Sequence, residues 1–248
     1  MTDFKAIKGF NVQSIAGDTS PVNEGQVYYN STAGTMNISA LVYGTGSWAS
    51  GGNVNTARMT SAASGTQTAS LVFGGDQYNS GPIVALTELY NGSSWTEVND
   101  LNTARQGLGG SGTQTAALAF GGPSPTTGAF TESWDGTNWT EVGDLNAAAT
   151  LCAGFGTQAA SLRAAGYTTA ASATTELWNG TSWTEVNDLN TARYYVSGCG
   201  STTAGLVVSG FNGSAITPQA ETWNGTSWTE VADVNTARFF SGTAGTQT

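Results

Sequence analysis

Four arginines recur at one position of a repeating pattern, each directly after a Thr-Ala dipeptide: Arg58, Arg105, Arg193 and Arg238. The planar guanidinium group donates paired hydrogen bonds to carboxylate or sulfate oxygens. A ring of these side chains would therefore bind an acidic group of a ligand or partner. The alternative is structural, with each arginine pairing with the acidic residue five positions earlier, such as Asp188 for Arg193, or capping nearby carbonyls. In the third copy of the pattern the arginine is replaced by Ala149.

Aromatic residues recur with the same period and suggest either carbohydrate binding or core packing. One position is always tryptophan, at Trp95, Trp139, Trp183 and Trp228, and another aromatic residue stands five residues before each. Exposed tryptophan rings can stack on sugars, whereas rings that recur in every copy are what the packing between neighbouring sheets requires. The repetition favours packing for both sets.

The residue types that acid–base and metal chemistry need are mostly missing. The chain has no histidine, which removes the commonest metal ligand and the commonest base near neutral pH. A glutamate follows each tryptophan by two residues: Glu97, Glu141, Glu185 and Glu230. This repetition is typical of a solvated outer strand and not of a catalytic pair. Cys152 and Cys199 differ in register and are expected to be small buried thiols. We therefore expect a protein that is not an enzyme and binds no metal or cofactor; carboxylate-based hydrolysis or elimination is the weakest of three hypotheses.

The elements that must position these residues repeat at intervals of 47, 44, 44 and 45 residues, measured between successive tryptophans from Trp48 to Trp228. Each copy ends in a block such as Trp178-Asn-Gly-Thr-Ser-Trp183, whose Asn-Gly dipeptide favours a tight hairpin. The copy at 103–146 contains four short strand-like runs with turn residues between them and no helical spacing. Five such copies predict an all-β propeller with five four-stranded antiparallel blades.

The repeat begins and ends inside a copy, which predicts how the last blade closes. Its inner strand, 239–245, leads to Thr248, where other copies continue into a second strand. Residues 24–30, 35–43 and 48–52 have the pattern of the second, third and fourth strands. We expect strands from both termini to complete the last blade, which makes residues 24–248 one propeller domain.

Segments that differ between copies are the best candidates for specific binding. The loops between second and third strands vary, and their exposed aromatic candidates are Tyr78, Tyr167 and Phe211. We expect these loops at the same end as the arginines. Residues 1–23 lie outside the repeats and contain Phe4, Lys5, Ile7, Lys8 and Phe10. This segment is interpreted as an attachment arm or oligomerisation strand, with a disordered tail as the alternative.

Charge and hydropathy argue against nucleic-acid binding, membrane insertion and a secretory signal. The formal net charge of −10 argues against nucleic acid as a main ligand, because phosphate binding needs a positive surface. No apolar run is long enough for a membrane span, and residues 1–18 lack the apolar core of a signal peptide. We therefore expect no membrane insertion and no secretory signal.

The repeat resembles kelch-type β-propellers. Phe73-Gly-Gly75 and Phe120-Gly-Gly122 match the double glycine of the kelch second strand, and the aromatic–turn–tryptophan block matches the third-to-fourth hairpin. The resemblance covers about residues 24–248. The chain departs from the pattern at Ala165-Gly166 and Ser209-Gly210, and kelch proteins usually have six or seven blades. Kelch-fold oxidases need copper-binding histidines, which this chain lacks.

A narrower resemblance concerns the beginning of the chain. Phe4-Lys5 followed by Gly9, and then Pro21-x-x-Glu-Gly-Gln-Val-Tyr-Tyr-Asn30-Ser-Thr, are similar to the start of many virion proteins of tailed, often marine, bacteriophages. Gly-Thr-Gln-Thr-Ala and Tyr-Asn-Gly-Thr-Ser-Trp repeats are frequent in those proteins. The resemblance implies a non-enzymatic virion component, on a tail fibre, tail tip or head surface, assembled in the host cytoplasm. It would bind the host surface or another virion protein, and the N-terminal arm would support a homo-oligomer. The alternative is a glycan-binding lectin that uses the loop aromatics.

Overall fold

The computed structural model describes residues 13–15, 27–38, 50–77, 81–122 and 128–246, and it divides the chain into two compact units, Met1–Ser50 and Gly51–Thr248. In the described residues every regular element is a strand. Among these residues no helix has the length and apolar character that a membrane span requires. The predicted all-β class is confirmed.

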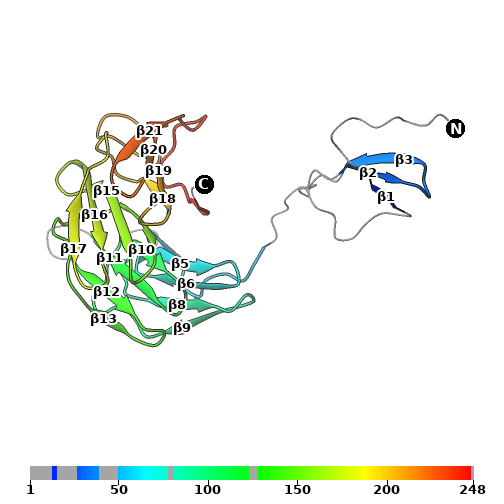
Figure 1. Cartoon of the computed structure of the whole chain (residues 1–248). Coiled ribbons are helices and arrows are strands. Elements are labelled where there is room, and N and C mark those ends of the chain that lie inside the picture. The colour runs from blue at the N-terminus through cyan, green and yellow to red at the C-terminus, as the bar shows by residue number, and fades with distance from the viewer. Residues whose placement is uncertain (1–12, 16–26, 39–49, 78–80, 123–127, 247–248) are drawn as a thin grey trace. The chain divides into compact units, whose positions relative to one another are not determined.

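The unit Gly51–Thr248 is a β-propeller with four complete blades (Figure 1). Each blade is an antiparallel meander of four strands paired in chain order. The first blade consists of β5 (Ala62–Thr66), β6 (Ala69–Phe73), β8 (Thr87–Tyr90) and β9 (Trp95–Val98). The second consists of β10 (Gly109–Gly112), β11 (Ala117–Phe120), β12 (Thr131–Trp134) and β13 (Trp139–Glu141).

The third blade consists of β14 (Ala153–Gly156), β15 (Ser161–Tyr167), β16 (Ala171–Trp178) and β17 (Trp183–Val186). The fourth consists of β18 (Ser197–Gly200), β19 (Gly205–Val208), β20 (Ala220–Trp223) and β21 (Trp228–Val231). A short pair, β4 (Arg58–Met59) and β7 (Asp76–Gln77), extends the first blade beyond its inner hairpin.

The predicted tight turn closes the hairpin between the third and fourth strands. In the second blade Gly136 has φ 94°, a conformation that glycine adopts without steric cost. Asp135 Oδ1 accepts hydrogen bonds from the backbone N–H groups of Thr137 and Asn138, at 2.8 and 2.7 Å. These bonds lower the pKa of Asp135. The turn sequence therefore sets the register in which Trp134 opposes Trp139.

The hydrophobic core lies between successive blades, in three clusters. Tryptophans of both recurring positions are buried in the second, third and fourth blades: Trp134, Trp139, Trp178, Trp183, Trp223 and Trp228. Each outer-strand tryptophan also reaches the preceding blade; Trp139 Nε1, for example, donates to Thr87 Oγ1 at 3.1 Å. The interpretation of these aromatics as packing residues is confirmed for these blades, so their rings are not available for sugars.

Five equivalent residues line one central cavity of about 260 Å³: Thr60, Gly107, Leu151, Tyr195 and Phe240. All five have a left-handed backbone conformation, with φ between 53° and 62°. Gly107 N–H donates to Thr60 O at 2.8 Å, and Leu151 N–H donates to Gly107 O at 2.6 Å. The C-terminal segment that contains Phe240 thus takes a fifth place around the axis, beside β18, where Thr243 Oγ1 donates to Gly198 O at 2.8 Å.

The described residues form four complete blades, one fewer than the five that the sequence predicts. In the unit Met1–Ser50, β2 (Val27–Asn30) pairs antiparallel with β3 (Thr35–Ile38), as the sequence predicts. The other edge of β2, which closure of the last blade requires, is paired in parallel with β1 (Gln13–Ile15). The predicted boundary between residues 23 and 24 lies outside the described residues. Of the strand predicted at 48–52, residues 48–49 lie outside them as well, and residues 50–52 form no strand.

Candidate functional site

Three of the four recurring arginines lie inside their blades and bind a glutamate of the third strand. Arg105 Nη2 donates to Glu132 Oε1 at 2.8 Å, and its Nη1 donates to two backbone carbonyls. Arg58 pairs with Glu88 at 2.9 Å, and Arg193 pairs with Glu221 at 2.7 Å. None of these arginine side chains is more than 1% exposed.

An asparagine three residues before the arginine binds the second oxygen of the same carboxylate. Asn102 donates from its backbone N and from Nδ2 to Glu132 Oε2, at 2.7 and 2.8 Å. Asn190 makes the same two bonds to Glu221 Oε2, both at 2.8 Å. We call an asparagine and an arginine that are placed to bind one carboxylate a carboxylate clamp. The clamp balances a buried glutamate with a cation and satisfies both carboxylate oxygens.

The third blade builds the same site with an arginine from another strand. Ala149 stands where the loop arginine is expected, and Arg163 of β15 reaches Glu176 Oε1 instead. Arg163 Nη1 donates to Ala165 O and Thr174 O at 3.2 and 2.9 Å. Asn146 donates from its backbone N and from Nδ2 to Glu176 Oε2, at 2.8 and 2.9 Å, as in the other clamps. Each of the four blades thus places a guanidinium at this carboxylate, and the third blade supplies it from a different backbone position.

This geometry supports the structural alternative for Arg58, Arg105 and Arg193. Burial lowers the pKa of each guanidinium, and the paired glutamate opposes that shift. The partner expected from the sequence, the aspartate five positions earlier, is corrected to a glutamate of the third strand. Asp100 Oδ1, for example, accepts a hydrogen bond from the backbone N–H of Thr87 at 3.0 Å.

Arg238 differs from the other recurring arginines because it is exposed. Its Nε donates to Thr236 O at 3.3 Å. Among the residues that the structure describes, no carboxylate forms an ion pair with it. Of the four predicted arginines, Arg238 is the one whose guanidinium can reach a ligand.

Two of the predicted loop aromatics meet around a tyrosine that lies three residues before the inner strand β18. The ring centroid of Tyr194 lies 4.9 Å from that of Tyr167 and 5.5 Å from that of Phe211. Backbone bonds fix this arrangement, since Tyr194 and Phe211 exchange N–H···O bonds at 3.0 and 2.8 Å. Tyr78, the third predicted aromatic, lies outside the described residues, as do the arm residues Phe4, Lys5, Ile7, Lys8 and Phe10.

The aromatic surface continues from Tyr194 into the C-terminal segment. Tyr195 lies 4.9 Å from Tyr194 and 4.1 Å from Phe240, measured between ring centroids. Phe239 lies 5.4 Å from Phe240. The sequence did not single out Tyr194, Tyr195, Phe239 or Phe240 as binding residues. The available signal was the residue after each arginine position, which is aromatic in the last two copies and is Met59, Gln106 and Thr150 in the first three.

A cavity of about 520 Å³ lies beside the Tyr167–Tyr194 pair, between loops of the third and fourth blades. Its polar lining residues are Thr169, Asn212 and Ser214. Aromatic faces combined with hydroxyl and amide groups are suited to ligands that carry both apolar ring faces and hydroxyls. We call Tyr167, Tyr194, Thr169, Asn212 and Ser214 the loop-face pocket.

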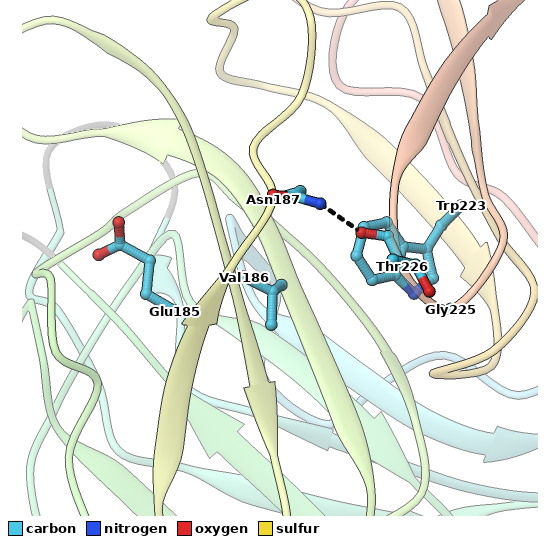
Figure 2. Close-up of a pocket in the computed structure, with 6 residues that line it drawn as sticks. All are labelled: Glu185, Val186, Asn187, Trp223, Gly225 and Thr226. Carbon is cyan, nitrogen blue, oxygen red and sulfur yellow. Dashed lines mark hydrogen bonds between the residues drawn. The ribbon is translucent and has the colours of Figure 1, made fainter.

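Another cavity, of about 480 Å³, lies between the outer strand of the third blade and the hairpin turn of the fourth (Figure 2). Asn187 Nδ2 bridges the two blades by donating to Thr226 O at 2.8 Å, while the Glu185 carboxylate points away from Trp223. The first and second blades share this bridge, because Asn99 Nδ2 donates to Thr137 O at 3.0 Å. Because this contact recurs between blades, we interpret the cavity as a consequence of blade packing and not as a binding site.

The remaining candidates for chemistry are isolated from one another. The repeating glutamates Glu97, Glu141, Glu185 and Glu230 are exposed on outer strands, as predicted. Cys152 is buried and Cys199 is partly buried; both thiols are free, and desolvation raises the pKa of each. Within the described part of the chain, no three His, Cys, Asp or Glu side chains come together as a metal site.

The described residues form a β-propeller with an aromatic-lined pocket at the end where its inner strands begin. Comparison with known proteins adds no name to this description, since no family model and no curated protein matches the chain.

Proposed function

We propose that this protein is a non-enzymatic binding module of a bacteriophage particle, on a tail fibre, tail tip or head surface. Its loop face would bind the host surface or another virion protein, and its N-terminal arm would attach or oligomerise it. The observation that carries the binding role is the continuous aromatic surface from Tyr167 through Tyr194 to Phe240. The virion assignment is supported by the sequence resemblance of residues 4–32. On this proposal the protein is assembled in the host cytoplasm and acts in the virion.

A kelch-type fifth blade is part of the proposal. The position of Phe240 at the central cavity and the bond from Thr243 to β18 support an inner fifth strand at the C-terminal segment. The other three strands would come either from residues 24–52 of the same chain or from another polypeptide.

Mass spectrometry of purified particles from the source tests the virion assignment. We expect the chain in stoichiometric copies, and a variant that lacks residues 1–23 should fold but no longer be incorporated. The matched control is a particle whose copy carries Glu141→Gln, a change of an exposed outer-strand residue, which should be incorporated normally. Absence of the chain from every particle, or normal incorporation without the arm, would contradict the assignment.

A glycan-binding lectin is the second candidate, and the loop-face pocket favours it. Tyr194→Ala removes the central ring of the pocket, while Tyr194→Phe keeps the ring and removes the hydroxyl. On a glycan array followed by calorimetric titration of the best ligand, we expect Tyr194→Ala to weaken binding by about 1–3 kcal/mol. We expect Tyr194→Phe to weaken it less.

Phe239→Ala is the control for the lectin hypothesis, because Phe239 is an exposed aromatic outside the loop-face pocket. It should leave glycan affinity unchanged. An array without any bound glycan, or equal losses for Tyr194→Ala and Phe239→Ala, would count against the lectin hypothesis.

A further inference from the structure

The chain contains a fourth Asn-x-x-Arg motif, Asn235-Thr-Ala-Arg238, at the end of the fourth blade. Its backbone is held in the way that the other clamps are held. Gly210 N–H donates to Arg238 O at 3.1 Å, as Gly166 N–H donates to Arg193 O at 2.8 Å. Val234 N–H donates to Pro218 O at 3.0 Å, as Leu189 N–H donates to Ala173 O at 3.0 Å. The fourth blade therefore positions this motif for the same geometry.

The side chains of this motif, by contrast, are open to solvent. Asn235 and Arg238 are both exposed, and no carboxylate in the described residues pairs with Arg238. Nearby apolar side chains are also uncovered: Val231 is 39% exposed, Phe239 42% and Phe240 58%. The equivalents of Val231 in the first three blades are half-buried, because the next blade packs against them. We call Asn235, Arg238, Val231, Phe239 and Phe240 the terminal seat.

The four occupied sites show what such a clamp binds. Each holds a glutamate from the third strand of a blade, and an aromatic residue follows that glutamate by two positions: Glu88-Leu-Tyr90, Glu132-Ser-Trp134, Glu176-Leu-Trp178 and Glu221-Thr-Trp223. The carboxylate satisfies the guanidinium and the asparagine together, while the strand covers the apolar side chains of the preceding blade.

The N-terminal segment of this chain lacks that carboxylate. In the block that ends at Trp48, the residue two positions before Tyr43 is Leu41. A blade built from residues 24–52 would therefore leave Asn235 and Arg238 without an acceptor. Burying an unpaired guanidinium is strongly unfavourable, which disfavours this occupant.

We propose that the terminal seat binds a β-strand of another polypeptide that carries a Glu-x-Trp or Glu-x-Tyr motif. Asn235 and Arg238 bind the glutamate, while Val231, Phe239 and Phe240 pack against the strand and its hairpin. The partner is thus a repeat of the same chemical type as the blades of this chain, and the contact joins one propeller to the next protein in an assembly. This inference stands independently of the virion assignment.

A cyclised hairpin with the sequence of residues 129–142 tests the proposal, because it contains Glu132 and Trp134 together with their turn. Titrated calorimetrically into the full chain, it should bind with one-to-one stoichiometry. Glu132→Gln in the peptide should weaken binding by about 10- to 100-fold, which is the expected effect of losing hydrogen bonds to a charged group. Glu141→Gln, which changes the peptide charge equally at the outer strand, should leave binding nearly unchanged.

The protein side is tested with Arg238→Gln and Asn235→Ala, which change exposed residues and should leave the fold intact by circular dichroism. Both should weaken binding of the wild-type peptide, and neither should affect the Glu132→Gln peptide further. The proposal is overturned if no peptide binds, if the two peptide variants bind equally, or if Arg238→Gln has no effect. It is also overturned if a peptide of residues 24–52 binds more tightly than the glutamate hairpin, since the occupant would then be the chain itself.

Discussion

Replacing Arg163 with valine is expected to lower the free energy of unfolding by about 3–5 kcal/mol, because it leaves Glu176 buried without its cation. Both side chains of the pair are at most 1% exposed. The lost guanidinium also donates to Ala165 O and Thr174 O, so two carbonyls lose their partner as well. Valine is the matched substitution, since Val72 and Val207 occupy this position in the first and fourth blades. Urea denaturation followed by circular dichroism measures the loss.

The same chain offers a rescue for this variant. Adding Ala149→Arg to Arg163→Val should restore most of the lost stability, because the loop at residue 149 is held as it is in the other blades. Gly122 N–H donates to Ala149 O at 2.9 Å, as Gly75 N–H donates to Arg105 O at 2.7 Å. From this backbone position Arg105 and Arg193 reach the equivalent carboxylate oxygen.

The control for the rescue is Ala149→Arg alone. It places two guanidinium groups at one buried carboxylate and should destabilise the protein through repulsion and overpacking. A double variant that is no more stable than Arg163→Val would show that the site depends on the β15 position and not on the presence of a guanidinium.

The blade architecture could be predicted because its determinants are local. The Asn-Gly and Asp-Gly turns, the short strand runs and the period of the tryptophans act within one repeat, and each copy repeats the information. The partner of each arginine was not predictable in this way, because the glutamate lies about 30 residues further along, on another strand. The sequence nevertheless contained a sign of this shared partner. The one copy that lacks the loop arginine, at Ala149, is the one that has an arginine at position 163.

The fifth blade could not be predicted from repeat matching alone. The strand pattern assigns residues 24–30 to a second strand. It does not determine which strand pairs with each edge of β2. Pairing with β1 uses the edge that closure needs. The loop-face pocket depends on Tyr167 and Tyr194, which lie next to a backbone bond, since Gly166 N–H donates to Arg193 O at 2.8 Å. The aromatic residue types at these two positions do not recur in every copy, so the repeat gives no signal for their contact.

Trp183→Ala is expected to lower the free energy of unfolding by about 3–5 kcal/mol, as the loss of a large buried aromatic side chain does. Trp183 is 4% exposed, and its ring centroid lies 4.9 Å from that of Phe120 in the preceding blade. Its Nε1 donates to the buried Thr131 Oγ1 at 3.0 Å. The substitution therefore opens a cavity between two blades and removes the bond that joins them. Urea denaturation by circular dichroism again measures the effect.

Two substitutions separate the packing of Trp183 from its hydrogen bond. Trp183→Phe keeps most of the ring and leaves the Thr131 hydroxyl without its donor, so a loss of about 1–3 kcal/mol is expected. Trp95→Ala changes the same repeat position in the first blade, where the ring is only half-buried and Nε1 donates to O of the exposed Gly52 at 2.9 Å. This variant should lose less than half as much stability as Trp183→Ala. Equal losses at positions 95 and 183 would mean that the ring stabilises its own hairpin, and a loss well below 1 kcal/mol at Trp183 would place it on the surface, available to stack on sugars.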